Sequence, residues 1–451
     1  MAGVFPNVPG TGDNIPVSTY TVGITESYPN VNRQRIIESS INSKERVDIL
    51  PINMGINNSV TDRYLEFRIP GTVGSFMDLS SLVLEMKFDL TLNDGSELPN
   101  DLNIGLVNGI SNTLFKAVSV FINDKLVESN PVFNYTSYLK MLTNINRDNV
   151  NTFGKCGFFH DDANGGTVTK TYQAATFTTN TNLEHKLLRQ LRSRDGIDVC
   201  FPLLFDSNSL DMYLLDGVDL RLRLEMANNN WLFNSNADVS DVSLNIRKAK
   251  LWLDRVIPHY NAMAALNEAL SVKPIEYVFQ KNLHKTYVVG SNENSIMIDQ
   301  PFGLVIPKKM NMIIVNMNAF SGRTSLNGLY FEHANLENLL LTVNGNTIYN
   351  IHTHFPQSYV QTYYETLKTI GLNVDHMITH DSFNGGRTVF SFNFVHETVE
   401  ETLPVESSAS LRINVKFRDN LTAPHIILLI AETTGLLIID QHRIVTCDVR
   451  G

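Results

Sequence analysis

The feature of this sequence that most constrains its fold is a recurring pattern of short segments in which apolar and polar residues alternate. In the first half these segments are 64–69, 82–90, 117–122, 220–226 and 242–253, and in the second half they are 286–289, 312–317, 339–343, 389–392, 411–417 and 425–430. Alternation with a period of two is typical of strands that bury one face of a sheet. Because helical patterns do not separate these segments, the sequence predicts an all-β fold of sandwiches or barrels.

A weak internal repeat links the two halves of the chain. The segment Val120-Phe-Ile-Asn-Asp-Lys-Leu-Val matches Leu341-Thr-Val-Asn-Gly-Asn-Thr-Ile, with Asn123 and Asn344 where a tight hairpin needs a positive φ angle. Segment 220–226 then matches 411–417, in the same order. The spacing between the two landmarks differs between the halves, so we expect a duplicated unit with loops of different length.

The length of 451 residues favours two domains, because a single hydrophobic core stops growing below this size. Residues 1–60 are rich in Asn, Pro, Gly and Ser and predict an extended N-terminal arm. We place the first β domain at 61–257, a helical linker at 258–275, the second β domain at 276–440 and a C-terminal tail at 441–451. The polar, turn-rich stretch 143–182 predicts a surface insertion.

Charge and cysteine content exclude several classes of protein. The net charge of −10 disfavours binding of nucleic acid without sequence specificity, and the first sixty residues are not a basic arm. Cys156, Cys200 and Cys447 have neither disulfide nor zinc-knuckle spacing. Without a signal peptide or an apolar run long enough to cross a bilayer, we expect a soluble protein made inside the cell, with no transmembrane segment.

The common catalytic signatures are absent from the sequence: it has no phosphate-binding Gly loop, no GxSxG elbow and no HExxH helix. We therefore predict a protein that is not an enzyme, with no catalytic, cofactor-binding or metal-ligating residues and no cofactor. The alternative is a carbohydrate-binding or cupin-like metal protein, based on His352 and His354 together with His376, His380 and Asp381. An H-x-H pair on a strand shares one face, but turn residues surround these histidines, which favours loops.

Two further groups of residues are interpreted as contact surfaces. The run Arg189-Gln-Leu-Arg-Ser-Arg is expected to be an inter-subunit or solvated edge rather than a nucleic-acid site. Tyr359, Tyr363 and Tyr364 are expected to be interface anchors, because tyrosine combines a large apolar ring with a hydrogen-bonding hydroxyl.

A series of longer motifs runs through most of the chain in a specific order. They begin at Leu114-Phe-Lys-Ala-Val, Tyr135-Thr-Ser-Tyr, Gly157-Phe-Phe-His, Cys200-Phe-Pro-Leu, Ile246-Arg-Lys-Ala, Ile306-Pro-Lys-Lys, Phe331-Glu-His-Ala-Asn-Leu, Tyr363-Tyr-Glu-Thr, Phe383-Asn-Gly-Gly and Ile439-Asp-Gln-His-Arg. Together they resemble the major capsid proteins of Maverick/Polinton elements and the related adintoviruses.

The resemblance implies a double jelly roll, which consists of two eight-stranded antiparallel sandwiches in one chain. It also implies a structural role in the virion: three chains would form a pseudo-hexagonal capsomer in the icosahedral shell of a DNA virus or virus-like element. The expected partners are two sister subunits, neighbouring capsomers and a separate penton or minor capsid protein. The internal repeat is what such a fold would leave in the sequence.

Overall fold

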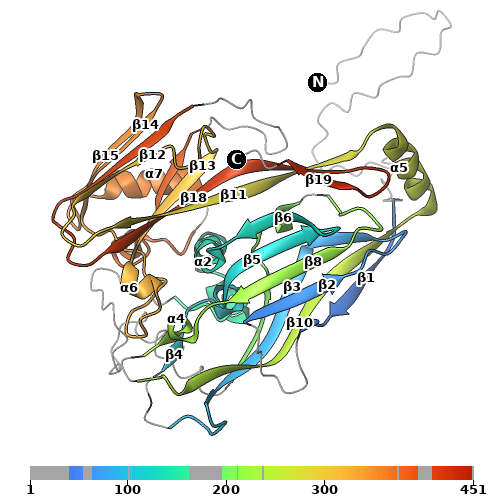
Figure 1. Cartoon of the computed structure of the whole chain (residues 1–451), viewed down its shortest axis with the longest axis horizontal. Helices are drawn as coiled ribbons and strands as arrows, with labels where there is room; N and C mark the ends of the chain where they lie inside the picture. The colour runs from blue at the N-terminus through green and yellow to red at the C-terminus, as the bar shows by residue number, and fades with distance from the viewer. Residues whose placement is uncertain are drawn as a thin grey trace, which may run out of the picture. The chain divides into compact units, whose positions relative to one another are not determined.

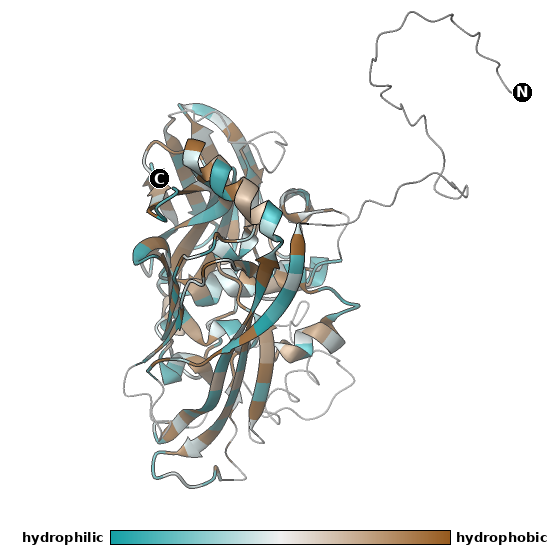
Figure 2. Ribbon diagram, turned by 90° about the vertical axis from the view of Figure 1, so that its right-hand side faces the viewer, coloured by the Kyte–Doolittle hydropathy of each residue, from teal (hydrophilic) through white to brown (hydrophobic). Residues whose placement is uncertain are grey.

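Strands make up most of the regular structure in the computed structural model (Figure 1). The structure describes residues 40–53, 63–99, 102, 104–161, 196–210, 212–235, 238–372, 375–394 and 409–448. Within these ranges the residues from Ser40 onward belong to one unit. Figure 2 shows hydrophobic and hydrophilic bands alternating along the strands, as the sequence pattern predicts.

The first half contains eight principal strands in the described residues. They are β1 (Ile41–Ile49), β2 (Tyr64–Ile69), β3 (Phe76–Leu92), β5 (Phe115–Ile122), β6 (Lys125–Asn130), β7 (Ile197–Pro202), β8 (Leu220–Met226) and β10 (Val242–Pro258). They form two antiparallel sheets, β1-β10-β3-β7 and β2-β8-β5-β6. A two-stranded pair, β4 (Gly105–Leu106) with β9 (Phe233–Asn234), lies outside these sheets.

The second half repeats this arrangement. Its strands are β11 (Ile275–Val289), β12 (Ser295–Asp299), β13 (Lys309–Asn316), β14 (Leu336–Val343), β15 (Asn346–His352), β16 (Phe390–Asn393), β17 (Leu411–Phe417) and β18 (His425–Ile439). The sheets are β11-β18-β13-β16 and β12-β17-β14-β15, and β19 (Val445–Asp448) adds to β18. If the eight strands of each half are numbered in order, both halves read 1-8-3-6 and 2-7-4-5. This is the strand order of a jelly roll, so the duplication predicted from the sequence is confirmed.

Alternating side chains fill each sandwich. In β2, Leu65 and Phe67 are fully buried while their neighbours are more exposed, and in β3 the same holds for Leu84 and Met86. Side chains from both sheets of each half belong to the hydrophobic core. Burial of a Leu or Phe side chain contributes roughly 1.5–3 kcal/mol, so these alternating segments supply much of the stability.

The two matching hairpin turns have the predicted backbone conformation. Asn123 and Asp124 have φ angles of 46° and 60°, and Asn344 and Gly345 have 50° and 81°. Each Asn also makes the same pair of bonds in its own half. Asn123 exchanges hydrogen bonds with the backbone of Asp219, and Asn344 does so with Ser410, the residues that immediately precede β8 and β17.

Nine helical elements accompany the strands in the described residues: α1 (Ile110–Thr113), α2 (Phe133–Asn144), a π-helix (Val150–Gly154), a 3-10 turn (Asp206–Ser209), α4 (Asn229–Leu232), α5 (Tyr260–Val272), α6 (Met317–Phe320), α7 (Val360–Ile370) and α8 (His380–Asn384). Helix α5 is the predicted linker helix and joins β10 to β11. The sequence did not predict α2 and α7. Helix α2 is buried around most of its circumference and carries Asn, Thr and Ser among its buried residues, so it lacks a clear apolar stripe.

Three expected boundaries differ from the structure. The arm predicted at 1–60 includes β1, which pairs with β10 as an edge strand; six of its nine residues are exposed and four are charged, so no alternation marks it. The predicted tail at 441–451 includes β19. The insertion predicted at 143–182 is part of the core up to residue 161, where Phe158 and Phe159 are fully buried. The rest of that stretch lies outside the described residues, as does the part of the arm at 1–39.

Candidate functional site

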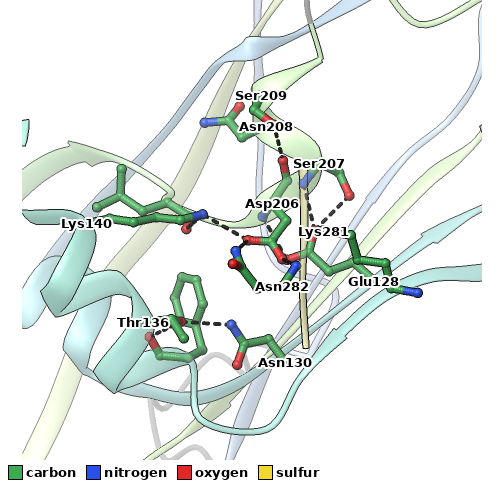
Figure 3. A network of polar contacts seen from close by, with 12 residues as sticks. Glu128, Asn130, Thr136, Lys140, Asp206, Ser207, Asn208, Ser209, Lys281 and Asn282 are labelled. Carbon is green, nitrogen blue, oxygen red and sulfur yellow. Dashed lines mark hydrogen bonds and ion pairs between the residues drawn. The ribbon is translucent and has the colours of Figure 1, made fainter. Parts of the chain in front are cut away.

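A buried carboxylate, Asp206, lies where segments of the two sandwiches meet. It begins the 3-10 turn after β7 and is 2% exposed. Its Oδ1 accepts hydrogen bonds from Lys140 Nζ at 2.9 Å and Asn282 Nδ2 at 2.6 Å, and its Oδ2 accepts one from the Asn282 backbone N–H at 2.8 Å (Figure 3). Because Lys140 is on α2 and Asn282 is on β11, this one carboxylate joins the first half to the second.

A second buried carboxylate, Glu128 on β6, binds the same turn. Its Oε1 accepts from the Asp206 backbone N–H at 2.8 Å, and its Oε2 accepts from the backbone N–H and the hydroxyl of Ser207, both at 2.7 Å (Figure 3). Burial, with the neighbouring charge of Asp206, raises the pKa of Glu128 to about 7.

Burial also acts to raise the pKa of Asp206, but the ammonium group of Lys140 and the hydrogen bonds from Asn282 outweigh it. The pKa of Asp206 is therefore held below its ordinary value. The two neighbouring carboxylates titrate apart, and Glu128 takes up a proton well before Asp206.

His284 lies two residues after Asn282 on β11, so both side chains are on the same face of the strand. Burial lowers the pKa of His284 to about 4, although the Asp206 carboxylate acts in the opposite direction. Its Nε2 has no hydrogen-bond partner among the residues that the structure describes. The junction therefore holds a neutral imidazole at physiological pH.

Arg443, between β18 and β19, makes a second connection between the halves. Its Nη2 donates to Asp216 Oδ1 at 2.6 Å and its Nε donates to the Asp216 backbone oxygen at 2.8 Å. The backbone oxygen of Arg443 accepts from Nδ2 of the turn residue Asn123 at 2.7 Å. The motif Ile439-Asp-Gln-His-Arg thus ends in a residue that binds the first sandwich.

Aromatic side chains form a third connection. Tyr135 on α2 stacks on Phe320 of α6, with ring centroids 5.3 Å apart, and its hydroxyl accepts from Trp231 Nε1 at 3.3 Å. A Cβ atom at Gly328 would lie 2.6 Å from Trp231 Nε1, so only glycine permits this approach. Because buried polar and aromatic contacts accumulate at several separate points, the junction fixes the two sandwiches as one body.

The structure does not bring the candidate metal-binding histidines together. His352 and His354 are exposed, and Asn338 lies beside the ring of His352. His376 is buried and both its ring nitrogens face backbone oxygens, of Thr143 and Gly371. In the described part of the chain no three His, Cys, Asp or Glu side chains gather as metal ligands.

The tyrosine group is mostly an internal cluster rather than the expected set of interface anchors. Tyr359 is 6% exposed and stacks on Phe355, Phe383 and His380. Tyr363 packs against Phe383 and donates a hydrogen bond to the Ile378 oxygen. Tyr364 alone of the three is largely exposed, at 53%. The interface expectation was wrong for Tyr359, because the local sequence pattern does not show that His380 and Phe383, more than twenty residues away, stack on its ring.

The structure also bears on the basic run, the cysteines and the membrane expectation. The basic run at Arg189 lies outside the described residues. In the described residues Cys156, Cys200 and Cys447 form no disulfide. No helix in the described ranges is both long and apolar enough to cross a membrane. The junction residues Asp206, Glu128 and Asn282 were missed because they are far apart in the sequence and belong to no recognised motif.

Two jelly rolls, joined in one chain by a linker helix and a buried junction, define an all-β double jelly-roll protein. No family model and no curated protein matches the sequence. Solved structures do share the fold. A chain in the cryo-electron microscopy structure of the Sputnik virophage is 13% identical with a TM-score of 0.62, and the match covers 96% of this chain and 94% of that one.

Two further structures are described by name as major capsid proteins. The mavirus protein is 10% identical with a TM-score of 0.52, covering 98% of this chain and 97% of that chain. The Faustovirus protein is 9% identical with a TM-score of 0.57, covering 91% and 93%. At these identities the comparisons establish a common fold, and the fold extends over nearly the whole length of each chain.

Proposed function

We propose that this chain is a major capsid protein that builds the icosahedral shell of a DNA virus or virus-like element. The observation that carries the proposal is the whole-chain match of the duplicated jelly roll to the mavirus and Faustovirus major capsid proteins. The role is structural and requires no catalysed reaction. The ordered motifs favour the Maverick/Polinton and adintovirus group within this class.

The geometry of the chain suits a trimeric capsomer. Three chains, each with two similar sandwiches, present six similar units around one axis and so fill a pseudo-hexagonal position in a lattice. This requires that the two sandwiches keep a fixed relation, which the contacts of Asp206, Arg443 and Tyr135 provide. The proposed partners are two sister subunits, neighbouring capsomers and a separate penton or minor capsid protein, with residues 1–39 as a tie between capsomers.

Helix α7 is the proposed subunit contact in the second half. Val360 and Tyr364 are 61% and 53% exposed, and their spacing of four residues places them on one side of the helix. Leu372, 53% exposed, follows just after the helix. Lys368 is also exposed and lies one turn beyond Tyr364, so the exposed apolar stripe is short. Exposed apolar residues grouped on one side of a helix are typical of a surface that another subunit covers.

We predict that Val360→Asp weakens the trimer, because it replaces an apolar side chain that the proposed contact would bury with a charged one. The control is Ile348→Asp, at an exposed apolar position on strand β15 that is not part of the stripe. Negative-stain images of the wild type should show hexagonal particles or closed shells, and Val360→Asp should yield mostly single chains. Unchanged particles with Val360→Asp would contradict the contact, whereas a wild type that never leaves the monomer would contradict the function.

A further inference from the structure

A cavity of about 500 Å³ opens at one end of the second sandwich. Its walls come from three connections: β13–β14 supplies Tyr330 and Glu332, β15–β16 supplies Asn384, and β17–β18 supplies Asn420 and Thr422. A volume of this size accommodates a small molecule. The cavity lies at the His425–Val289 end of the paired strands β18 and β11, and helix α5 adjoins the opposite end, where Ile439 pairs with Ile275.

Part of the cavity wall is a buried acid–base pair. His425 Nε2 lies 3.0 Å from Glu332 Oε2, and the two residues are 5% and 7% exposed. The Nδ1 of His425 lies 2.7 Å from the Ala423 backbone oxygen, so Nδ1 carries a hydrogen and donates it. The Glu332 carboxyl and the imidazole therefore satisfy one another, and the pair needs no metal cation to balance it.

Two motifs that the jelly-roll strands do not explain converge on this cavity. Glu332, His333, Ala334 and Asn335 of the motif Phe331-Glu-His-Ala-Asn-Leu line it. Ala334 and Asn335 both have positive φ angles, 47° and 51°, a conformation that is costly for alanine.

The second motif, Phe383-Asn-Gly-Gly, forms the facing wall. Asn384 lines the cavity, and the backbone at Gly386 has a φ of 104° and touches the ring of Tyr330, so that any side chain at this position would collide with the ring. The Gly386 oxygen also accepts from the Phe331 N–H at 2.9 Å, which binds the two motifs to each other. The wall is thus shaped by unusual backbone on both sides.

We propose that this cavity binds a saccharide of one or two rings. The side-chain amides of Asn335 and Asn420 offer donors and acceptors together, as neighbouring hydroxyls on a sugar require, and Asn384, whose buried Oδ1 has no hydrogen-bond partner among the described residues, also lines the cavity. His333, stacked on Phe355 with centroids 4.3 Å apart, and Pro356 add flat apolar surface for the face of a sugar ring.

A metal ion fits the cavity less well. In the described ranges no cluster of three acidic or metal-ligating side chains is present. Asp419 and Asn420 are exposed at the rim, whereas Glu332 is already paired with His425. A neutral polyhydroxylated ligand uses the amides without requiring additional negative charge.

The test is saturation-transfer NMR on the full chain, with methyl α-mannoside, methyl β-galactoside and N-acetylglucosamine as separate probes. We expect transfer to the ring protons of at least one probe, and Thr422→Trp should abolish it, because Thr422 is an exposed residue at the cavity mouth. The matched control is Thr347→Trp, an exposed threonine on β15 outside the cavity, which should leave the transfer unchanged.

Two results would overturn the proposal: no transfer to any of the three probes, or transfer that survives Thr422→Trp undiminished. Unfolding temperatures of both variants, compared with the wild type, show whether a lost signal reflects the cavity or a loss of fold. The assay reports sugar binding whatever the oligomeric state of the purified protein, so its outcome is independent of the proposed capsid role.

Discussion

At the scale of single residues, Asp206 has a central position because its carboxylate contacts Lys140 on α2 and Asn282 on β11 while being almost fully buried. Removing this carboxylate leaves the backbone N–H and the side-chain amide of Asn282 without their acceptor, and leaves the Lys140 ammonium, whose side chain is 31% exposed, without its ion-pair partner. We predict that Asp206→Ala lowers the free energy of unfolding by about 2–4 kcal/mol, measured by urea denaturation.

The control for this prediction is Asp299→Ala, which removes an ion pair with Arg412 whose side chains are 51% and 53% exposed. Solvent screens such a pair, so the expected loss is at most about 1 kcal/mol. Equal losses for the two variants would show that the Asp206 contacts do not hold the junction together.

The pH dependence of stability also belongs to single residues. Burial lowers the pKa of His284 from its ordinary 6.5 to about 4. Protonation of this imidazole therefore favours the unfolded chain, and the folded protein loses stability as the pH falls from 6.5 to about 4. Burial raises the pKa of Glu128 from 4.5 to about 7. Protonation of this carboxyl therefore favours the folded protein, which gains stability as the pH falls from about 7 to 4.5. The two effects oppose each other in the wild type.

We predict that Glu128→Gln removes the contribution of Glu128 to the pH dependence and leaves that of His284 unopposed. The unfolding temperature of this variant should fall more steeply than that of the wild type between pH 7 and pH 4.5. Thermal denaturation followed by circular dichroism at several pH values measures this. Parallel curves for the two proteins would mean that Glu128 does not titrate in this range.

At the scale of elements, the hairpin turns were the most predictable feature and they also allow a direct test. Asn344 needs both a positive φ and an acceptor for the Ser410 N–H, at 2.9 Å. We predict that Asn344→Ala lowers the free energy of unfolding by about 1–2 kcal/mol, because the variant loses the hydrogen bond to Ser410 and strains the turn.

Asn344→Gly separates the two contributions, since glycine adopts the turn but cannot bind Ser410. In urea denaturation we expect Asn344→Gly to lower the free energy of unfolding by less than Asn344→Ala does. The corresponding substitutions at Asn123 should rank in the same order, because Asn123 makes the equivalent bonds with Asp219. A reversed order at either turn would contradict the structural equivalence of the two halves.

The strands that sequence patterns predicted differ physically from those that they missed. Strands β2, β8 and β17 have one buried and one exposed face, so alternation marks their full length. Strands β1 and β15 are sheet edges with mostly exposed residues and show no alternation. Strand β16 was predicted, at 389–392, although its first three residues are all buried, because Val, Phe, Ser and Phe alternate in the sequence there.

At the scale of the whole molecule, the duplication was predictable because each jelly roll uses the same turn chemistry between its fourth and fifth strands. The junction was not predictable, because its polar contacts join residues such as Asp206 and Asn282, or Asp216 and Arg443, that only the folded chain brings together. The cavity of the second sandwich depends likewise on three connections meeting in space.

The central claim is that three copies of this two-sandwich chain form one capsomer. The most direct measurement is the solution mass of the purified protein by light scattering. With a chain mass of 50.7 kDa, we expect a species of three times that mass, about 152 kDa, or larger closed assemblies built from it. A protein that remains at 50.7 kDa at high concentration would contradict the claim.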